Sequence, residues 1–289
     1  MKPAAGGGFA VAGLLLCAAS LASGHVSARI AFGHGVNLLT AATLRAFCAS
    51  LVVLLFVLSR RAFSPVTRGD LAGSFVLALG VVGQTLLIQL AVKRLPVTVA
   101  ILLFYTYPFF TALVSALTGD HRITRTLALS LVAAFSGLLL VLGVSPAGVD
   151  PWGVAAAVGA AVVFTGTLTL TPRLAPGLNA PFRTLLMFTA ATAVIGGIAV
   201  GTDNVHWPSE QIAWAGLAGL AAFYALGIVG LYLLLPRLGP MQTAVVLNME
   251  PVFVAVISWL AVGERLTGLQ LAGAALVVGA VIANQARRR

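Results

Sequence analysis

A series of apolar runs, each near the length that crosses a lipid bilayer, constrains this chain more than any other feature. A spanning helix needs roughly 20 apolar residues, whereas a strand of a membrane barrel shows about 10 residues of in/out alternation. The runs are unbroken and do not alternate, and breaks with charged residues, proline or glycine separate them. We therefore predict an all-α integral membrane protein with ten transmembrane helices. The runs cover residues 8–27, 37–58, 70–92, 96–118, 125–144, 152–171, 182–201, 211–233, 240–262 and 268–285.

The composition excludes a soluble domain. Hydrophobic residues make up 60% of the 289 residues and charged residues 8%, whereas soluble domains carry about 25% charged residues. The net charge of +10 does not indicate a nucleic-acid partner, because the basic residues are scattered through short breaks. Cys17 and Cys48 lie inside apolar runs without a metal-binding or disulfide pattern. We expect no metal and no cofactor.

Lysine and arginine are unevenly shared between the two sides of the predicted membrane. Twelve lie on the side of both tails and four on the other side, and Arg45 lies within the second run. Positive charge stays on the cytoplasmic side during insertion, so we predict that both termini are cytoplasmic. The twelve are Lys2, Arg60, Arg61, Arg68, Arg122, Arg125, Arg173, Arg183, Arg237, Arg287, Arg288 and Arg289, and the four are Arg29, Lys93, Arg94 and Arg265.

An internal repeat divides the chain into halves. The segment 95–124 aligns without a gap on 238–267, at an offset of about half the chain length, and the aligned pairs include Pro108 with Pro251 and Arg122 with Arg265. Each half then holds five runs. Because five is odd, the second half enters the membrane from the opposite side. Inverted repeats of this kind are typical of transporters with a binding site near the bilayer midplane.

We accordingly predict a first five-helix repeat at 1–147 and an inverted second repeat at 148–289. A signal peptide is an alternative interpretation of the first run, but its removal would break the repeat. A structural duplication without transport is the alternative interpretation of the repeat itself.

Glu250 lies close to the centre of the ninth run, where an ionised carboxylate costs several kcal/mol. It should therefore face a water-filled cavity, find a partner, or be protonated. Pro251 cannot donate an amide, so we expect a helix kink there and another at Pro108. Tyr107 occupies the position in the first repeat that Glu250 has in the second. Two interpretations stay open: a neutral acid hydrogen-bonded between helices, or a wall of a substrate cavity.

Other polar residues at membrane depth are further candidates for substrate binding. Asn248 would point away from Glu250 unless the helix is unwound at Pro251. Arg45 either reaches outward to the interface or binds a substrate carboxylate or an acid. Gln84 and Tyr224 each bond either a neighbouring helix or a ligand. Thr165 belongs to a stripe of small residues that is typical of close helix packing, and its hydroxyl could reach a cavity. This stripe consists of Gly153, Ala157, Ala161, Thr165 and Thr169.

The end of the second repeat resembles the signature of the drug/metabolite transporter superfamily, in its EamA-like ten-helix family. The residues that carry the resemblance are Glu250-Pro251, Gly263-Glu264, Leu266-Thr267, Gly273 and Gly279. The first repeat departs from the pattern, because Tyr107 stands where the acid would be. A role for the acids therefore carries over only to Glu250 and Glu264. The resemblance implies helices around a central cavity and a bacterial inner-membrane carrier that exports small metabolites.

The resemblance implies neutral or aromatic amino acids as the substrates, carried by alternating access. A mostly apolar site suits such amphipathic molecules. Proton-coupled efflux of other small metabolites or drugs is the alternative. A membrane-embedded enzyme is a remote alternative, since the sequence shows no catalytic motif and no pair of acids at membrane depth. We expect the lipid bilayer and a small molecule as partners, and a monomer, with a dimer as the alternative.

Overall fold

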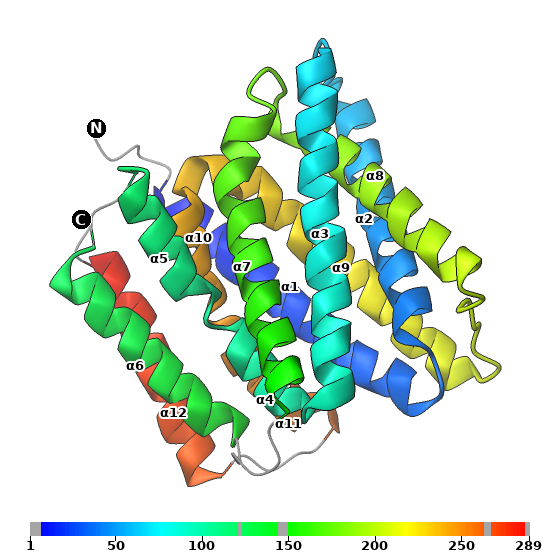
Figure 1. Ribbon diagram of the computed structural model, residues 1–289. Coiled ribbons are helices and arrows are strands. Elements are labelled where there is room, and N and C mark those ends of the chain that lie inside the picture. Colours follow the sequence, from blue (N-terminus) through cyan, green and yellow to red (C-terminus); the bar gives the residue numbers. More distant parts are fainter. Residues whose placement is uncertain (1–6, 121–122, 144–149, 263–266, 287–289) are drawn as a thin grey trace. The chain divides into compact units, whose positions relative to one another are not determined.

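A computed structural model describes residues 7–120, 123–143, 150–262 and 267–286, without the side chains of residues 7, 97, 98, 262, 285 and 286. All regular structure within these ranges is helical (Figure 1). The predicted residues Arg122, Glu264 and Arg265 lie outside them. The helices are α1 (Gly7–Gly33), α2 (Leu38–Arg60), α3 (Arg68–Arg94), α4 (Val97–Phe104), α5 (Tyr107–Leu117), α6 (Arg125–Leu142), α7 (Pro151–Leu174), α8 (Ala180–Gly201), α9 (Gln211–Leu238), α10 (Pro240–Leu247), α11 (Glu250–Val262) and α12 (Gly268–Ala286).

The predicted apolar runs correspond to membrane-length helical stretches. Within the described residues, nine stretches are long and apolar enough to cross a membrane. A tenth apolar helix, Gly268–Asn284, is shorter. The prediction of an all-helical membrane protein is confirmed, and the described residues hold nine to ten such apolar helices where ten were predicted.

Capping residues fix where several of these helices begin. Asn37, Thr124 and Asn179 are extended residues whose side-chain oxygens each accept a hydrogen bond from the amide three residues later, at 2.7, 3.2 and 2.9 Å. Such a bond satisfies one of the amide donors that the first turn of a helix leaves free. At the other end of α6, Gly143 adopts the left-handed conformation (φ 57) that commonly terminates helices.

The fourth and ninth predicted runs are each interrupted, so that each forms two helices. The first interruption consists of Tyr105 and Thr106, and the second of Asn248 and Met249. In a continuous helix the carbonyls of Phe104 and Leu247 would accept from residues 108 and 251, which are prolines and cannot donate. α4 and α10 end at these two residues. Both prolines then occupy the first turn of the next helix, where a missing amide proton costs little.

The chain forms two compact units. Unit 1 comprises Met1–Leu15, Gly83–Thr169 and Arg237–Arg289, and unit 2 comprises Leu16–Val82 and Leu170–Pro236. The helices α1, α3, α7 and α9 contribute residues to both. Each unit therefore draws on both halves of the sequence, and the repeat boundary between residues 147 and 148 remains a prediction.

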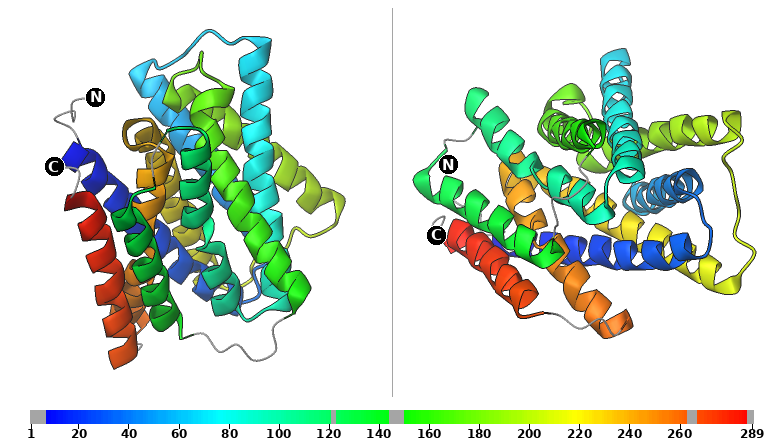
Figure 2. Two further views of the ribbon diagram at one scale, coloured as in Figure 1. Left: turned by 60° about the vertical axis from the view of Figure 1, so that its left-hand side comes forward. Right: turned by 60° about the horizontal axis from the view of Figure 1, so that its bottom comes forward.

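In unit 1, α6 and α12 lie side by side along much of their length (Figures 1 and 2). A glycine on each helix permits this approach. A Cβ atom added to Gly137 would lie 2.6 Å from the carbonyl oxygen of Gly273, and one added to Gly273 would lie 2.5 Å from the carbonyl oxygen of Gly137. Buried apolar residues from α5, α6, α10 and α12 form a core beside this contact. They are Ala112, Leu127, Leu131, Met241, Val245 and Val281.

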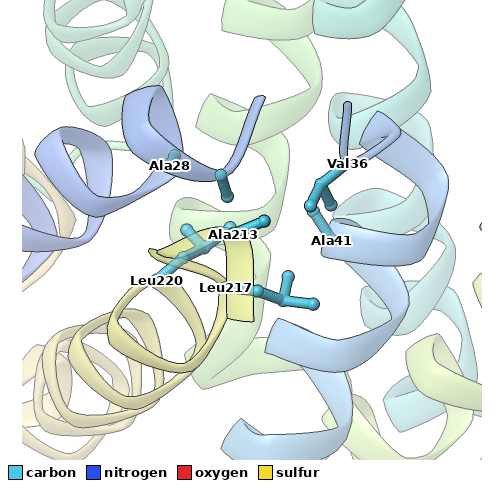
Figure 3. Packing of buried hydrophobic residues seen from close by; sticks show 7 residues of the cluster. Ala28, Val36, Ala41, Ala213, Leu217 and Leu220 are labelled. Atoms are coloured by element: carbon cyan, nitrogen blue, oxygen red, sulfur yellow. The ribbon is translucent and has the colours of Figure 1, made fainter. Parts of the chain in front are cut away.

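In unit 2, α2 packs against α8, and α1 packs against α9 through small residues. A Cβ atom added to Gly216 would lie 2.7 Å from the amide nitrogen of Ala31. The hydroxyl of Ser20 also donates to the carbonyl of Phe223 at 2.8 Å. A core of alanine, valine and leucine side chains lies beside this helix pair (Figure 3). It contains Ala28, Ala31, Val36, Ala41, Ala213, Leu217 and Leu220.

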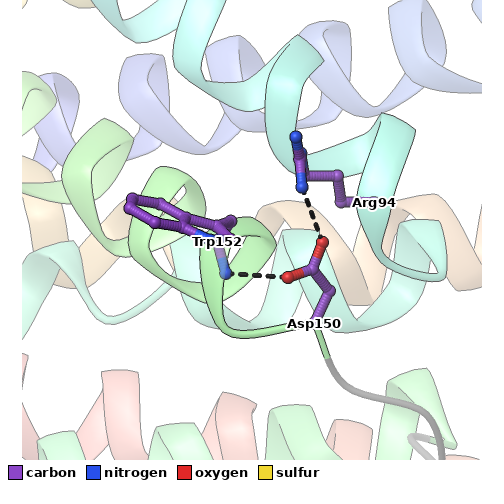
Figure 4. Close-up of polar contacts among 3 residues, drawn as sticks. All are labelled: Arg94, Asp150 and Trp152. Carbon is purple, nitrogen blue, oxygen red and sulfur yellow. Dashed lines mark hydrogen bonds and ion pairs between the residues drawn. The ribbon is translucent and has the colours of Figure 1, made fainter.

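Asp150, directly before α7, joins that helix to the end of α3 within unit 1 (Figure 4). Its carboxylate accepts from the amide of Trp152 at 2.9 Å and from the Nη1 of Arg94 at 3.0 Å. The Trp152 amide, followed by the Arg94 guanidinium, lowers the pKa of the Asp150 carboxyl below its ordinary value. A lowered carboxyl pKa contributes stability above the unfolded-state value near 3.9, and this stability is lost as the pH falls through the folded-state value.

We expect an Asp150→Asn variant to unfold a few degrees below the wild type at pH 7, because asparagine keeps only part of these contacts. The difference should shrink as the pH falls from about 5 to 3, because the wild-type carboxyl then becomes protonated. Thermal unfolding across this pH range checks the prediction. Asp203→Asn, in the α8–α9 loop, is the control, and an equal loss in both variants would argue against the contacts of Asp150.

Candidate functional site

The two helix interruptions of unit 1 place Tyr107 and Glu250 in one buried cluster. α5 packs against α10, and the Tyr107 hydroxyl donates to the carbonyl of Ala244 at 3.4 Å. The carboxyl group of Glu250, on the first residue of α11, is hydrogen-bonded to the hydroxyl of Tyr105 and interacts electrostatically with Tyr107. Of the three possibilities for this acid, the structure therefore shows a protein partner.

Aromatic rings enclose Tyr107. Its ring centroid lies 4.8 Å from that of Phe164 in an edge-on arrangement, 5.4 Å from Phe104 and 6.0 Å from Tyr105. Edge-on and tilted pairs of this kind are favoured by the ring quadrupoles. Tyr107 is 1% exposed, Tyr105 6% and Glu250 9%. All three side chains are therefore buried in this structure.

Two threonine hydroxyls complete the cluster from α5 and α7. Thr111 and Thr165 both donate to the carbonyl oxygen of Tyr107, at 2.8 and 3.1 Å, and their own hydroxyls are 3.3 Å apart. Each hydroxyl retains lone pairs that can accept a further donor. We refer to Tyr105, Tyr107, Thr111, Thr165 and Glu250 as the tyrosine–glutamate cluster.

The two remaining candidate residues of unit 1 are Asn248, close to Glu250 in the sequence, and Gln84, on a different helix. Asn248 belongs to the second interruption and is 7% exposed. Because the helix is interrupted there, the angular argument that separated Asn248 from Glu250 does not apply. Gln84, on α3, is half-buried, and no hydrogen bond joins it to the cluster among the described residues.

Arg45 and Tyr224 lie in unit 2, where the structure brings these two candidates together. The guanidinium carbon of Arg45 lies 4.6 Å from the centre of the Tyr224 ring. A cation over an aromatic face is stabilised by the ring quadrupole, by about 0.5–2 kcal/mol depending on its exposure. Arg45 thus contacts an aromatic ring of its own unit, an arrangement that its predicted roles did not include.

Sequence reasoning did not select Tyr105, Thr111, Phe104 or Phe164. Tyr105 and Thr111 flank Tyr107 in the "FYTYPFFT" segment, so the concentration of phenols and hydroxyls around one proline was an available signal. Phe164 was not distinguishable from an ordinary core residue, because its contact with Tyr107 depends on how α7 packs in unit 1.

The chemistry of the cluster suits recognition of a small amphipathic molecule. It offers one carboxyl group, two phenols and two hydroxyls among aromatic faces. Among the described residues no three histidine, cysteine or acidic side chains gather as metal ligands.

Comparison with known proteins gives the family. The model of the EamA-like transporter family matches residues 8–143 and again residues 151–284. The chain belongs to this family. An EamA-like transporter is a membrane protein that moves small molecules, so the predicted transporter class and family resemblance are confirmed.

Two curated relatives of this EamA-like transporter are named threonine/homoserine exporter RhtA, from Salmonella typhimurium strains SL1344 and LT2. Each is 28% identical over 210 residues, which covers 71% of this chain and 67% of the relative. A solved crystal structure of a protein is 21% identical to this chain, with a TM-score of 0.75. The match covers 96% of this chain and 99% of that one. At this identity it shows that the fold is shared.

Proposed function

We propose that this EamA-like transporter exports small neutral amino acids and related amphipathic metabolites by alternating access. The name of the RhtA relatives supports a neutral amino-acid substrate. The observation that carries the proposal is the burial of Glu250 against Tyr105, beside Tyr107, where two spanning segments are interrupted. Intramembrane acids are costly and are typically found in substrate or ion pathways.

In this proposal the α-ammonium group of the substrate binds at the tyrosine–glutamate cluster. A carboxylate attracts an ammonium group by charge, and the faces of Tyr105 and Tyr107 attract it through the ring quadrupole. The hydroxyls of Thr111 and Thr165 can accept further hydrogen bonds from it. Because several groups each contribute to binding the ammonium group, the cluster suits a substrate with one positive charge and an apolar or hydroxylated side chain.

The interruptions supply the mobility that a carrier needs. Non-helical backbone at membrane depth is tolerated where it is buried in protein or lines a cavity, and broken helices are common in transporters. Rotation of α5 or α11 about its interruption would separate Tyr105 from Glu250 and open the cluster to a substrate. Gln84 and Asn248 remain proposed substrate contacts within unit 1, and Arg45 and Tyr224 remain proposed substrate contacts within unit 2.

The proposed setting is the bacterial inner membrane, with both termini in the cytoplasm and residues 1–147 and 148–289 as inverted repeats. The charge asymmetry of the sequence supports this orientation. We propose a monomer as the functional form. Proton-coupled efflux is the second candidate, because an acid hydrogen-bonded to a phenol can exchange a proton when the pair separates.

Counterflow in proteoliposomes tests the substrate class. We expect saturable exchange of threonine, homoserine, leucine and phenylalanine, and exchange at least tenfold slower for glutamate and lysine, whose extra charge the cluster does not balance. The same panel with and without a pH gradient separates proton coupling from facilitated export. If protein that unfolds cooperatively exchanged none of the neutral amino acids, the substrate proposal would be wrong.

A further inference from the structure

One end of unit 2 carries a group of arginines that the transport proposal does not use. Segments 60–70 and 173–183, which join α2 to α3 and α7 to α8, are held together there. The side-chain amide of Asn179 donates to the carbonyl of Ala62 at 3.1 Å, and its backbone amide donates to the Ser64 hydroxyl at 3.2 Å. The rings of Phe63 and Phe182 pack edge-on at 5.7 Å. The two segments bring five arginines to this end, which we call the arginine rim. They are Arg60, Arg61, Arg68, Arg173 and Arg183.

Within segments 60–70 and 173–183, which the structure describes in full, five arginines stand against one acidic residue. Asp70 is the acidic residue of these two segments, and it is 5% exposed. Its carboxylate accepts from the amide and hydroxyl of Thr67, at 3.2 and 2.6 Å, and from the backbone amide of Gly177. Asp70 therefore fixes the start of α3 to the segment that precedes α8. Of the five arginines, all but Arg183 are exposed.

Two of the arginines occupy positions that their contacts within the protein do not explain. Arg61 has left-handed backbone (φ 49), which is strained for a non-glycine residue and at the end of a helix normally favours glycine. Arg183 is 5% exposed, and its Nε has no hydrogen-bond partner among the described residues. Its Nη1 reaches the carbonyl of Ala175 at 3.4 Å. A buried cation with so few partners gains from a nearby anion.

Apolar side chains stand beside these charges. Phe63 is 55% exposed and Val66 47%, and both lie in the segment that carries the arginines. The helices α2, α3, α7 and α8, which begin or end at the rim, are membrane-length and apolar. A ligand that fits this surface presents negative charge at its head and hydrocarbon below it.

We propose that the arginine rim binds anionic phospholipid, with the phosphate against the arginines and the acyl chains against Phe63 and Val66. Clusters of arginine directly beside membrane helices recognise anionic headgroups, each contributing on the order of tenfold or less in affinity. The geometry favours a lipid over a soluble anion, because a soluble anion leaves the apolar side chains uncovered.

The test measures the stability of the full-length protein in nanodiscs of phosphatidylcholine while phosphatidylglycerol is added. We expect phosphatidylglycerol to raise the unfolding temperature, and the combined Arg60→Gln, Arg61→Gln and Arg68→Gln variant to bind it at least tenfold more weakly. A control removes three exposed charges elsewhere, with Arg29→Gln, Lys93→Gln and Arg125→Gln. The control should keep the wild-type response.

A single variant separates lipid binding from folding. Arg61→Gly relieves the left-handed backbone, so it should be at least as stable as the wild type in phosphatidylcholine, yet it should bind phosphatidylglycerol more weakly. Equal responses of the triple variant and the control would overturn the proposal. So would stabilisation of the same size by inorganic phosphate at matched ionic strength, since a soluble anion would then suffice.

Discussion

Replacing Glu250 with glutamine is expected to lower amino-acid export at least tenfold while leaving the unfolding temperature within a few degrees of the wild type. Glutamine has nearly the same shape and can still accept a hydrogen bond from Tyr105, so the contact between α11 and α4–α5 is retained. It carries no charge, and a hydrogen bond to a charged group contributes about 1.5–3 kcal/mol, which corresponds to tenfold or more in affinity. Counterflow and thermal unfolding of the same preparation check both parts.

The Glu250→Gln variant distinguishes the two interpretations that the sequence left open. If Glu250 only joined helices as a neutral acid, glutamine would replace it and export would persist. Persistent export with wild-type kinetics would therefore remove Glu250 from the substrate path. The pH dependence of the residual flux decides a separate question: if it matched that of the wild type, this acid would not be the proton-coupling site. Tyr107→Phe, which keeps the ring and removes the weak 3.4 Å bond to Ala244, should reduce export much less.

Replacing Gly273 with alanine is expected to destabilise the α6–α12 pair by about 1–3 kcal/mol, the usual cost of overpacking. The added methyl group would lie 2.5 Å from the carbonyl oxygen of Gly137 and 2.7 Å from the Cβ of Leu140. These contacts include backbone, which cannot rotate away, so the helices must separate. A lower unfolding temperature in detergent or nanodiscs would report this loss.

Gly279→Ala is the matched control on the same helix. Its added methyl group would meet no atom within 4 Å, and alanine favours a helix over glycine by about 1 kcal/mol in peptides. We expect this variant to be as stable as the wild type or more stable. If Gly273→Ala and Gly279→Ala behaved alike, the close approach of α6 and α12 would not be a determinant of stability. Both glycines belong to the family resemblance, and only Gly273 has a packing role in this structure.

Much of the fold could be predicted because membrane helices are recognisable in a sequence from their length and apolar composition. The apolar runs and the capping residues between them are properties of short segments. The prolines 108 and 251 also marked the correct places, although kinked helices were expected and interrupted ones are found. The difference is local. The residues two and three positions before each proline are not helical, and they separate the two helices.

The site was less predictable, because it depends on contacts between segments far apart in the sequence. Glu250 and Tyr107 could be selected as polar residues at membrane depth. The partner of Glu250, Tyr105, was not selected, because its hydroxyl reaches the acid only through the packing of unit 1. The contact of Arg45 could not be predicted for the same reason. Its position over the Tyr224 ring follows from how α2 and α9 pack in unit 2, and no sequence pattern indicates it.

The central claim is that the tyrosine–glutamate cluster and the adjoining interruption contact the substrate. The most direct test is whether substrate protects an engineered cysteine there from alkylation. The chain has two cysteines, so a background without Cys17 and Cys48 is accessible by two substitutions. Asn248→Cys and Thr165→Cys then report on the cluster, and Ser209→Cys, in the exposed α8–α9 loop, is the control. We expect saturating threonine to slow alkylation several-fold at positions 248 and 165 and to leave position 209 unchanged. Equal alkylation rates with and without substrate, in variants that still transport, would contradict the account.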